Sequence, residues 1–369
     1  METITFFEFI QAYKDCRKRK TNTRAHGRFI RHFDTFLIDL HRSVNSGAFE
    51  PSAARVFAIT NPKPREVWAA QFHDRVVHHA IYNRILDRFH RRFIVDTYAC
   101  LPDRGVLYGV NRIHKFIRSA SEDFTYPVYV LQADLDNFFV SIDRCILETQ
   151  TLDFVPEPVL RQLLSVIIHH DVANDYILSG DPSQLDLIPS YKSLFYAPAG
   201  KGLPIGNLTS QLLANVYLNP LDQFIKHRLK VRYYGRYVDD IILIGKDPEY
   251  LCECFKHIQD KAWNTLELKF HPDKTKLLPV EKGVDFCGSR ILPYHVLTRD
   301  RTLRSLKRVA KEYEDIDGLE QLLSWEQSMN SYLGSVRHAR TRNFRKTIGS
   351  RYGFSLDDEL VKVSPDWRK

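Results

Sequence analysis

Two adjacent aspartates between two strand-like segments restrict the fold of this 369-residue chain more than any other feature of its sequence. Residues 232–236 and 241–244 have strand-like composition, and residues 231–245 as a whole predict a tight β-hairpin with Asp239 and Asp240 at its turn. A lone Asp-Asp pair is more often a solvated turn than a catalytic site. Here the arms of the hairpin are apolar, which places the two acids on a folded core.

A third aspartate, Asp134, ends another strand-like segment at residues 126–133. Carboxylates that lie close together raise one another's pKa unless a cation lies between them. Mg²⁺ prefers oxygen ligands and keeps waters that phosphate oxygens can replace. Two such ions can stabilise the attacking and leaving oxygens of an in-line displacement. We therefore expect Asp134, Asp239 and Asp240 to hold two Mg²⁺ ions, with Mn²⁺ as an alternative.

The charge of the chain is consistent with a polyanion partner. The net charge is +8, the sequence pI is about 9.0, and 44% of residues are hydrophobic, enough for two or three packed units. Basic residues gather in an N-terminal patch and a C-terminal patch. The N-terminal patch holds Lys14, Arg17, Lys18, Arg19, Lys20, Arg24, Arg28 and Arg31, and the C-terminal patch holds Arg337, Arg340, Arg342, Arg345, Lys346 and Arg351. Each patch alone reads as a solvated helix face, but together they favour phosphate contact.

Cysteine spacing and hydropathy exclude several classes of protein. The six cysteines form no pair of Cys-x-x-Cys knuckles, which indicates neither a zinc site nor a disulfide framework. Cys252 and Cys254 are expected to be one exposed and one buried thiol on a helix. No apolar run approaches the roughly 20 residues needed to span a bilayer, and no signal peptide opens the chain. We expect a soluble cytoplasmic protein without membrane partners.

Residue periodicity predicts an α+β fold. Helices are predicted over residues 3–20, 29–46, 72–93, 108–118, 143–151, 156–169, 208–218 and 250–265. Besides the hairpin, strands are predicted over 55–60, 66–70 and 126–133, near Lys269, and over 286–292. Asn219-Pro220 is expected to cap and restart a helix. Residues 171–201 read as a long irregular insertion, and the chain beyond about residue 298 reads as helical and basic.

An ordered set of motifs resembles the reverse transcriptase family. The motifs lie at residues 62–65, 74–77, 133–139, 202–211, 237–240, 271–275 and 286–288, in family order over about residues 61–292. The resemblance implies a right-hand polymerase: an antiparallel catalytic sheet flanked by helices, with a short helical thumb. Its regions would be residues 1–125 (N-terminal helices and fingers), 126–295 (palm with part of the fingers) and 296–369 (basic thumb).

The resemblance also implies roles for individual residues. Metal ligands would be Asp134, Asp239 and Asp240, with the backbone of Leu135. Nucleotide contacts would come from Lys63, Arg65, Phe139, Ile205, Gly206, Gln211 and Lys274, and template or primer contacts from Asn207, Phe286, Gly288, Arg337, Arg340, Arg342 and Arg345. Phe139 would exclude a ribose 2′-hydroxyl, and Lys274 would assist the pyrophosphate leaving group. Taken alone, a Phe after a strand is usually core, and Lys63 reads equally as an exposed basic residue.

Ile205 before Gly206, Gln211 after Ser210, and Tyr98-Ala99-Cys100 resemble the reverse transcriptases of diversity-generating retroelements. That subfamily implies a protein encoded by a bacterium or a phage. It also implies template-repeat RNA, an RNA–cDNA duplex, dNTPs, copying errors at template adenines, and a small, basic, oligomeric accessory protein. Many reverse transcriptases outside that subfamily carry Gln in place of Ile205, and the loss of its polar contacts would weaken rejection of wrong nucleotides. Two alternatives remain: a retron-type or defence-associated reverse transcriptase, and a catalytically inactive RNA-binding palm.

Overall fold

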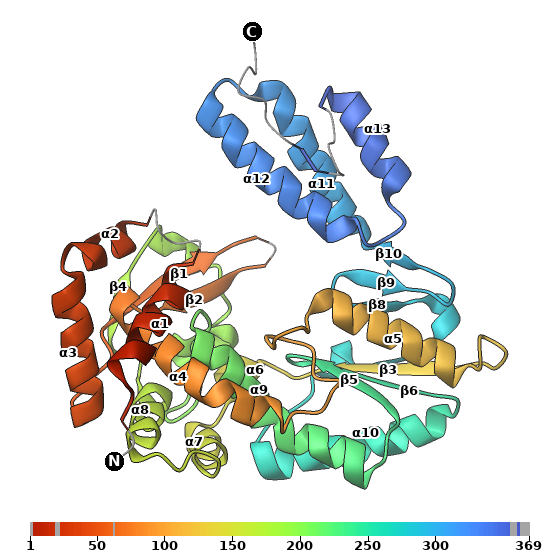
Figure 1. The fold of residues 1–369 in the computed structure, drawn as a ribbon. Coiled ribbons are helices and arrows are strands. Elements are labelled where there is room, and N and C mark those ends of the chain that lie inside the picture. Colours follow the sequence, from red (N-terminus) through yellow and green to blue (C-terminus); the bar gives the residue numbers. More distant parts are fainter. Residues whose placement is uncertain (1–2, 19–22, 62, 355–359, 362–369) are drawn as a thin grey trace. The chain divides into compact units, whose positions relative to one another are not determined.

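The structure, a computed structural model, describes residues 3–18, 23–61, 63–354 and 360–361 (Figure 1). The chain divides into two compact units. Unit 1 comprises Met1–Pro102, Gln132–Ile242 and Cys252–Thr275, and unit 2 comprises Asp103–Leu131, Leu243–Leu251 and Lys276–Lys369. Each unit combines helices with a 3-stranded sheet in which antiparallel pairing predominates, so the predicted α+β class is confirmed.

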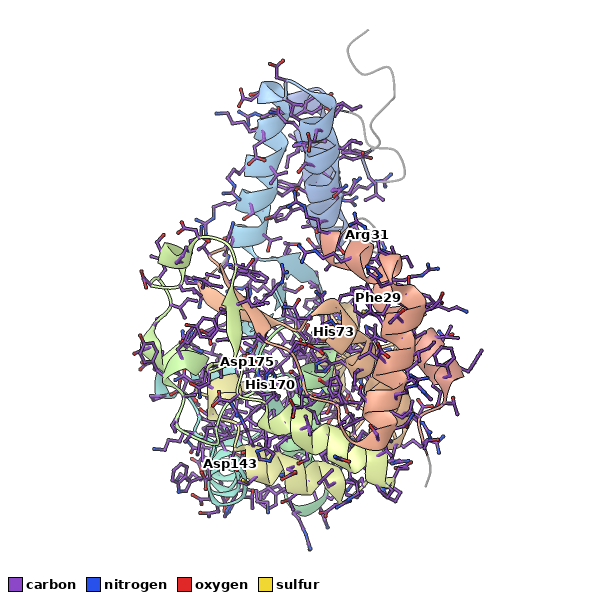
Figure 2. All side chains as sticks on the ribbon, turned by 90° about the vertical axis from the view of Figure 1, so that its left-hand side faces the viewer. Phe29, Arg31, His73, Asp143, His170 and Asp175 are labelled. Carbon is purple, nitrogen blue, oxygen red and sulfur yellow. The ribbon has the colours of Figure 1, made fainter. Side chains whose placement is uncertain are left out.

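Unit 1 begins with helices that pack through aromatic rings. They are α1 (Phe6–Arg17), α2 (Arg24–Arg31), α3 (Phe33–Ser46) and α4 (Phe72–His90). Thr5 and Glu8 form a capping box at the start of α1. The ring centroid of Tyr13 lies 5.6 Å from that of Phe29 (labelled in Figure 2), which lies 5.1 Å from that of Phe72.

One of the predicted N-terminal helices is in fact two. The prediction ran from residue 29 to residue 46, but His32, with φ −128° and ψ 37°, separates α2 from α3. The predicted end was confirmed, because Gly47 takes the left-handed conformation at φ 76° and closes α3.

A small sheet in unit 1 has the strand order β2-β1-β4. Strands β1 (Ala54–Ile59) and β2 (Arg65–Ala69) confirm the strands predicted over 55–60 and 66–70, and they pair antiparallel. The irregular insertion predicted at residues 171–201 is wrong in part, because it contributes β4 (Tyr176–Leu178), which pairs parallel to β1. His170 Nε2 lies 3.4 Å from Asp175 Oδ2 where this segment begins (Figure 2).

The insertion is also held to β2 from its far end. The buried carboxylate of Glu66 accepts hydrogen bonds from Ser193 Oγ at 2.8 Å and from the backbone N–H of Leu194. Val172 and Leu194 join Trp68 in one apolar cluster. Tertiary contacts, rather than local periodicity, therefore order this segment.

Three further helices of unit 1 follow the predictions closely, with one exception. α7 (Arg144–Leu152) begins at the capping residue Asp143, and α8 (Pro158–His169) begins at a proline. The exception is α9 (Leu208–Gln223), which was expected to restart at Pro220. It instead runs through Pro220 without a break and continues into a π-helical turn at Phe224–Arg228. Leu218, Leu221 and Ile225 on both sides of Pro220 are completely buried, so packing keeps the helix continuous.

The predicted hairpin is confirmed: β5 (Tyr233–Tyr237) and β6 (Asp240–Gly245) lie in a sheet of order β5-β6-β3-β7. β3 (Tyr129–Asp134) ends at the third aspartate. Instead of a strand near Lys269, Phe270 forms an isolated bridge with Leu135, and β7 (Lys276–Pro279) comes later. On α10 (Pro248–Leu266), Cys252 is exposed and Cys254 is buried, as predicted.

Unit 2 contains α5 (Val106–Ala120) and a sheet of order β10-β9-β8. These strands are β8 (Val284–Phe286), β9 (Ser289–Ile291) and β10 (Val296–Thr298). The helical C-terminal segment is confirmed for its described residues. α11 (Asp300–Lys311), α12 (Leu319–Val336) and α13 (Arg342–Tyr352) share a core that includes Trp325 and Met329. Within the described part of the chain, no helix is both long and apolar enough for a membrane span.

Candidate active site

The turn between β5 and β6 presents the paired aspartates. Val238 precedes Asp239 and has φ 56°, a left-handed conformation that is rare for a β-branched residue. Such a conformation costs about 1–3 kcal/mol and persists only where the surrounding structure enforces it. Asp240 then begins β6, so both carboxylates belong to a short turn carried by two strands.

The end of β3 brings Asp134 to this turn. The N–H of Leu135 donates to the backbone oxygen of Asp239 at 3.1 Å, and the backbone oxygen of Asp134 accepts from the N–H of His271 at 2.8 Å. The N–H of Asp136 donates to the backbone oxygen of Lys269 at 2.8 Å. These backbone bonds place three acids from distant parts of the sequence at one point of unit 1.

The acids interact strongly with one another and with one lysine. Loss of hydration and the charge of Asp134 raise the pKa of Asp239 to about 6, and loss of hydration together with Asp239 and Asp134 raises the pKa of Asp240 to about 7. Lys274 Nζ lies 2.5 Å from Asp134 Oδ1. Partial burial lowers the pKa of Lys274, but the hydrogen bond to Asp134 and the other carboxylates raise it above its ordinary value overall.

The donor set fits a divalent ion that prefers oxygen. Among the residues that the structure describes, no three His, Cys, Asp or Glu side chains form a ready-made metal cage. Mg²⁺ rarely uses such cages, because one or two carboxylates, waters and substrate phosphates complete its shell. This cluster attracts positive charge. The ammonium of Lys274 lies against Asp134, and the pKa values of Asp239 and Asp240 are raised, so both carboxylates bind protons readily. The residues present therefore fit a divalent metal ion.

The turn that precedes α9 is tied to β2. The N–H of Trp68 donates to the backbone oxygen of Ile205 at 2.8 Å, and the N–H of Ala70 donates to Asn207 Oδ1 at 3.1 Å. Gly206 has φ 137°, and a Cβ there would lie 2.7 Å from the backbone oxygen of Trp68. The structure thus requires glycine for the approach of β2. Asn207 is buried and its side-chain oxygen accepts within the protein, and its contact with template or primer stays a prediction.

The other predicted nucleotide contacts lie elsewhere in unit 1. Phe139 is half-buried on α6 (Phe138–Ser141), where its backbone oxygen accepts from the N–H of Leu203 at 2.8 Å. Gln211 is exposed on α9, and Lys63 and Arg65 are exposed at the β1–β2 hairpin. No hydrogen bond or ion pair within residues 63–354 joins these four side chains to the aspartates.

In unit 2, Phe286 is buried and Gly288 adopts φ 81° in the turn between β8 and β9. Arg337, Arg340 and Arg342 are exposed, as a phosphate contact requires. Arg345 is instead buried beside Thr341, 3.3 Å away, because it faces the core of the helical segment. We therefore leave Arg345 out of the phosphate-contacting set.

The N-terminal basic patch is exposed wherever it is described. Its described members, all in unit 1, are Lys14, Arg17, Lys18, Arg24, Arg28 and Arg31. Arg19 and Lys20 lie outside the described residues, as does Pro62 of the first motif.

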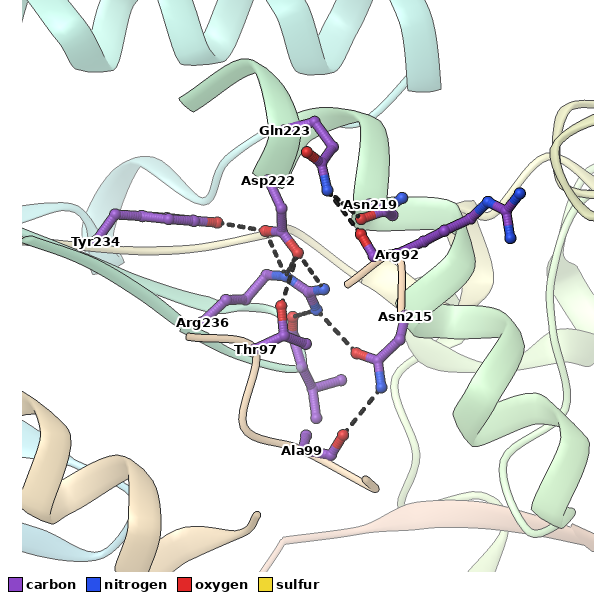
Figure 3. Close-up of polar contacts among 10 residues, drawn as sticks. Arg92, Thr97, Ala99, Asn215, Asn219, Asp222, Gln223, Tyr234 and Arg236 are labelled. Carbon is purple, nitrogen blue, oxygen red and sulfur yellow. Dashed lines mark hydrogen bonds and ion pairs between the residues drawn. The ribbon is translucent and has the colours of Figure 1, made fainter. Parts of the chain in front are cut away.

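The sequence interpretation missed a charged pair behind the aspartates. The arm 232–236 was expected to be apolar, yet Arg236 is completely buried against Asp222 of α9 (Figure 3). Asp222 lies directly after Leu221 and three residues before Ile225, both completely buried, so it stands on the buried face of this helix. A lone acid on such a face requires a buried partner, and that was the available signal.

Comparison with known proteins identifies a family. The profile described as reverse transcriptase (RNA-dependent DNA polymerase) matches residues 62–291. Protein YkfC of Escherichia coli (strain K12) is 24% identical over 284 residues, 67% of this chain and 68% of that protein. The Gag-Pro-Pol polyprotein of Mason-Pfizer monkey virus is 27% identical over 125 residues, 33% of this chain and 7% of the polyprotein.

Similar solved structures include two telomerases. Telomerase from Candida albicans in complex with a TWJ fragment of telomeric RNA has a TM-score of 0.46 and 11% identity, and covers 84% of this chain. Apo telomerase from Candida tropicalis has a TM-score of 0.48 and 10% identity, and covers 76% of this chain. The chain spans 57% and 52% of their lengths. The profile match, which extends across Asp134 and the Asp239–Asp240 hairpin, shows that this chain belongs to the reverse transcriptase family of RNA-dependent DNA polymerases.

Proposed function

We propose that this chain copies RNA into DNA, with Asp134, Asp239 and Asp240 holding two Mg²⁺ ions at its catalytic centre. The observation that carries the proposal is the meeting of the β3 end with the β5–β6 turn, through the bond from Leu135 N–H to the Asp239 oxygen. The organisation that accompanies it has N-terminal helices and fingers in residues 1–125, a palm in 126–295 and a basic thumb in 296–369.

Each proposed role uses a property of the side chain concerned. Asp134, Asp239 and Asp240, with the Leu135 backbone as a further ligand, would hold the divalent ions, and these would supply activation of the attacking 3′-hydroxyl and charge compensation for the leaving pyrophosphate. Lys274 remains an ammonium beside Asp134 and donates a proton or a charge-assisted hydrogen bond to the pyrophosphate. Lys63 and Arg65, both exposed, contact the triphosphate. The Phe139 ring lies under the sugar and excludes a ribose 2′-hydroxyl.

Primer extension tests this proposal directly. Native protein with an RNA template, an annealed primer, dNTPs and Mg²⁺ is expected to extend the primer, and Asp239→Asn is expected to reduce extension to background. Asp260→Asn on the exposed face of α10 is the matched control and is expected to extend normally. A native protein that binds the RNA but never extends the primer would instead favour an inactive RNA-binding palm.

We infer further that the enzyme serves a diversity-generating retroelement. Ile205 supports this, because its side chain offers no hydrogen bond to an incoming nucleotide or template base and its backbone oxygen is already engaged by Trp68. A site without polar contacts discriminates weakly between substrates. The partners would be a template-repeat RNA, the RNA–cDNA duplex and a small, basic, oligomeric accessory protein, in the cytoplasm of a bacterial host.

Sequencing of the cDNA tests this second proposal separately. Errors concentrated at template adenines are expected from the native protein, and Ile205→Gln is expected to lower their frequency. Faithful copying of adenines by an active native enzyme would favour a retron-type or defence-associated reverse transcriptase. Equal error frequencies in the two proteins would remove Ile205 from the explanation.

A further inference from the structure

A buried ion pair lies directly behind the catalytic turn in unit 1. Arg236 on β5 and Asp222 at the end of α9 are both completely buried, with Nη2 and Oδ2 2.7 Å apart and Nε and Oδ1 2.9 Å apart. Two hydroxyls complete the carboxylate: Tyr234 donates to Oδ1 at 2.6 Å and Thr97 to Oδ2 at 2.9 Å (Figure 3). Each carboxylate oxygen thus accepts from both a hydroxyl and the guanidinium.

Stability alone does not explain such a pair. Removing two charges from water is costly, and well-packed apolar residues of similar volume are often as stabilising as a buried pair or more so. The geometry around Arg236 is specific, because its planar guanidinium donates in fixed directions to several partners at once. A network of this kind restricts the orientation of whatever else it binds.

The remaining edge of the guanidinium reaches the catalytic turn. Arg236 Nη1 donates to the backbone oxygen of Val238 at 2.9 Å and to Asn215 Oδ1 at 3.2 Å. Val238 is the residue with the left-handed backbone, and its oxygen belongs to the peptide group that leads into Asp239. A strained conformation persists only when neighbours enforce it, and Arg236 is one of those neighbours.

Helix α9 connects this network to the opposite side of the site. Asn215 and Asp222 are seven residues apart, so two helical turns place them on one face. Asn215 Nδ2 also donates to the backbone oxygen of Ala99 at 2.9 Å (Figure 3). The same helix begins directly after the Ile205–Asn207 turn that β2 holds. One rigid element therefore bears both the turn beside the incoming nucleotide and the acceptors that orient Arg236.

We propose that Arg236 is a positioning residue for catalysis: its guanidinium, held by Asp222 and Asn215 of α9, fixes the Val238 peptide and so aims the Asp239 carboxylate at the reacting centre. The inference rests on the proposed polymerase function. Loss of the Arg236 guanidinium would misplace a metal-binding carboxylate without removing any group that binds the nucleotide. The effect should therefore fall on kcat rather than on KM.

The main variant replaces the network by apolar residues of similar size, Asp222→Leu with Tyr234→Phe and Arg236→Met. The matched control is Arg88→Met with Glu157→Leu. It removes another two-pronged arginine–carboxylate pair of unit 1, with bonds of 2.6 and 2.9 Å, between α4 and the residue before α8. Both are compared with the native protein for cooperative thermal unfolding, kcat, KM for dNTP, and amide hydrogen exchange of a peptide covering residues 236–242.

The expected result is a folded main variant with kcat lower by about 30-fold or more, since small misplacements of reacting groups have effects of that size. Its KM should remain within about threefold of native, and exchange in residues 236–242 should be faster. The control pair should leave kcat and this exchange close to native. A folded main variant with near-native kcat, or with a raised KM and unchanged kcat, overturns the proposal.

Arg236→Lys decides the matter if the main variant does not fold. It keeps a cation against Asp222, but a single ammonium cannot span the carboxylate and the Val238 oxygen. A kcat reduced by about tenfold with unchanged KM supports positioning. Near-native kcat, or loss of cooperative folding in this variant as well, assigns the pair to stability and overturns the proposal. An inactive native protein would count against the polymerase function itself, and the exchange measurement would still report on the turn.

Discussion

At the scale of single residues, Asp239 and Asp240 hold protons more tightly than isolated carboxylates. The pKa values of Asp239 and Asp240 are raised to about 6 and about 7, first by loss of hydration and then by neighbouring carboxylates. An acid with a raised pKa in the folded state binds more protons there than in the unfolded chain. Its contribution to stability therefore decreases as pH rises between about 4 and 7. A bound cation should remove this penalty, because it compensates the charge.

Asp240→Asn should expose this penalty. In metal-free buffer the variant should melt at the same temperature as the native protein near pH 4, where Asp240 is protonated. It should melt at a higher temperature at pH 8, where the native carboxylate is charged. Added Mg²⁺ should raise the melting temperature of the native protein more than that of the variant. Thermal unfolding by circular dichroism measures all three, with Asp260→Asn as the control. A difference between variant and native that stays constant with pH would contradict the assignment.

At the scale of elements, the sequence predicted those whose signals are local. Gly47 at the end of α3 and the paired aspartates of the β5–β6 turn are signals that lie within the elements themselves. The continuation of α9 through Pro220 could not be predicted in the same way, because burial on both sides of the proline decides it. The buried position of Arg345 and the order within residues 171–201 likewise depend on distant partners.

Glu66 is the residue on which the order of the 171–201 segment should depend most. Its buried carboxylate accepts from Ser193 and Leu194, so Glu66→Leu would leave the buried N–H of Leu194 without its acceptor. Leaving a buried donor unsatisfied costs about 1–3 kcal/mol. We expect faster proteolytic cleavage within residues 171–201 and a lower free energy of unfolding. Limited proteolysis with mass spectrometry measures the first and urea unfolding the second, with Glu249→Leu at an exposed position as control. Cleavage at the native rate would show that the apolar cluster holds the segment alone.

At the scale of the whole molecule, the catalytic chemistry was more predictable than its support. The three aspartates follow from residue types and from strands that the sequence indicates. Their support depends on Asp222 and Arg236, which come from a helix and a strand that are separate in the sequence, and on backbone bonds such as that from Leu135. Partners of this kind meet only in the folded protein, so a pattern within one segment of the sequence cannot predict which residues pair. The basic patches are intermediate, since composition predicts the charge but only the structure shows which residues are exposed.

The exposed N-terminal patch makes a quantitative prediction for RNA binding. Each neutralised phosphate of a single strand contributes about 0.7 to the slope of log affinity against log salt, because counterions are released. Replacing Arg24, Arg28 and Arg31 of α2, which are exposed at or near its ends, by Gln should lower the slope by about 2 if each contacts one phosphate. Fluorescence anisotropy of a labelled RNA across salt concentrations measures this. The exposed Arg228, Lys192 and Lys256 provide a control triple of equal charge in the same unit. Equal slope changes for the two triples would mean that net charge, and not the patch, attracts the RNA.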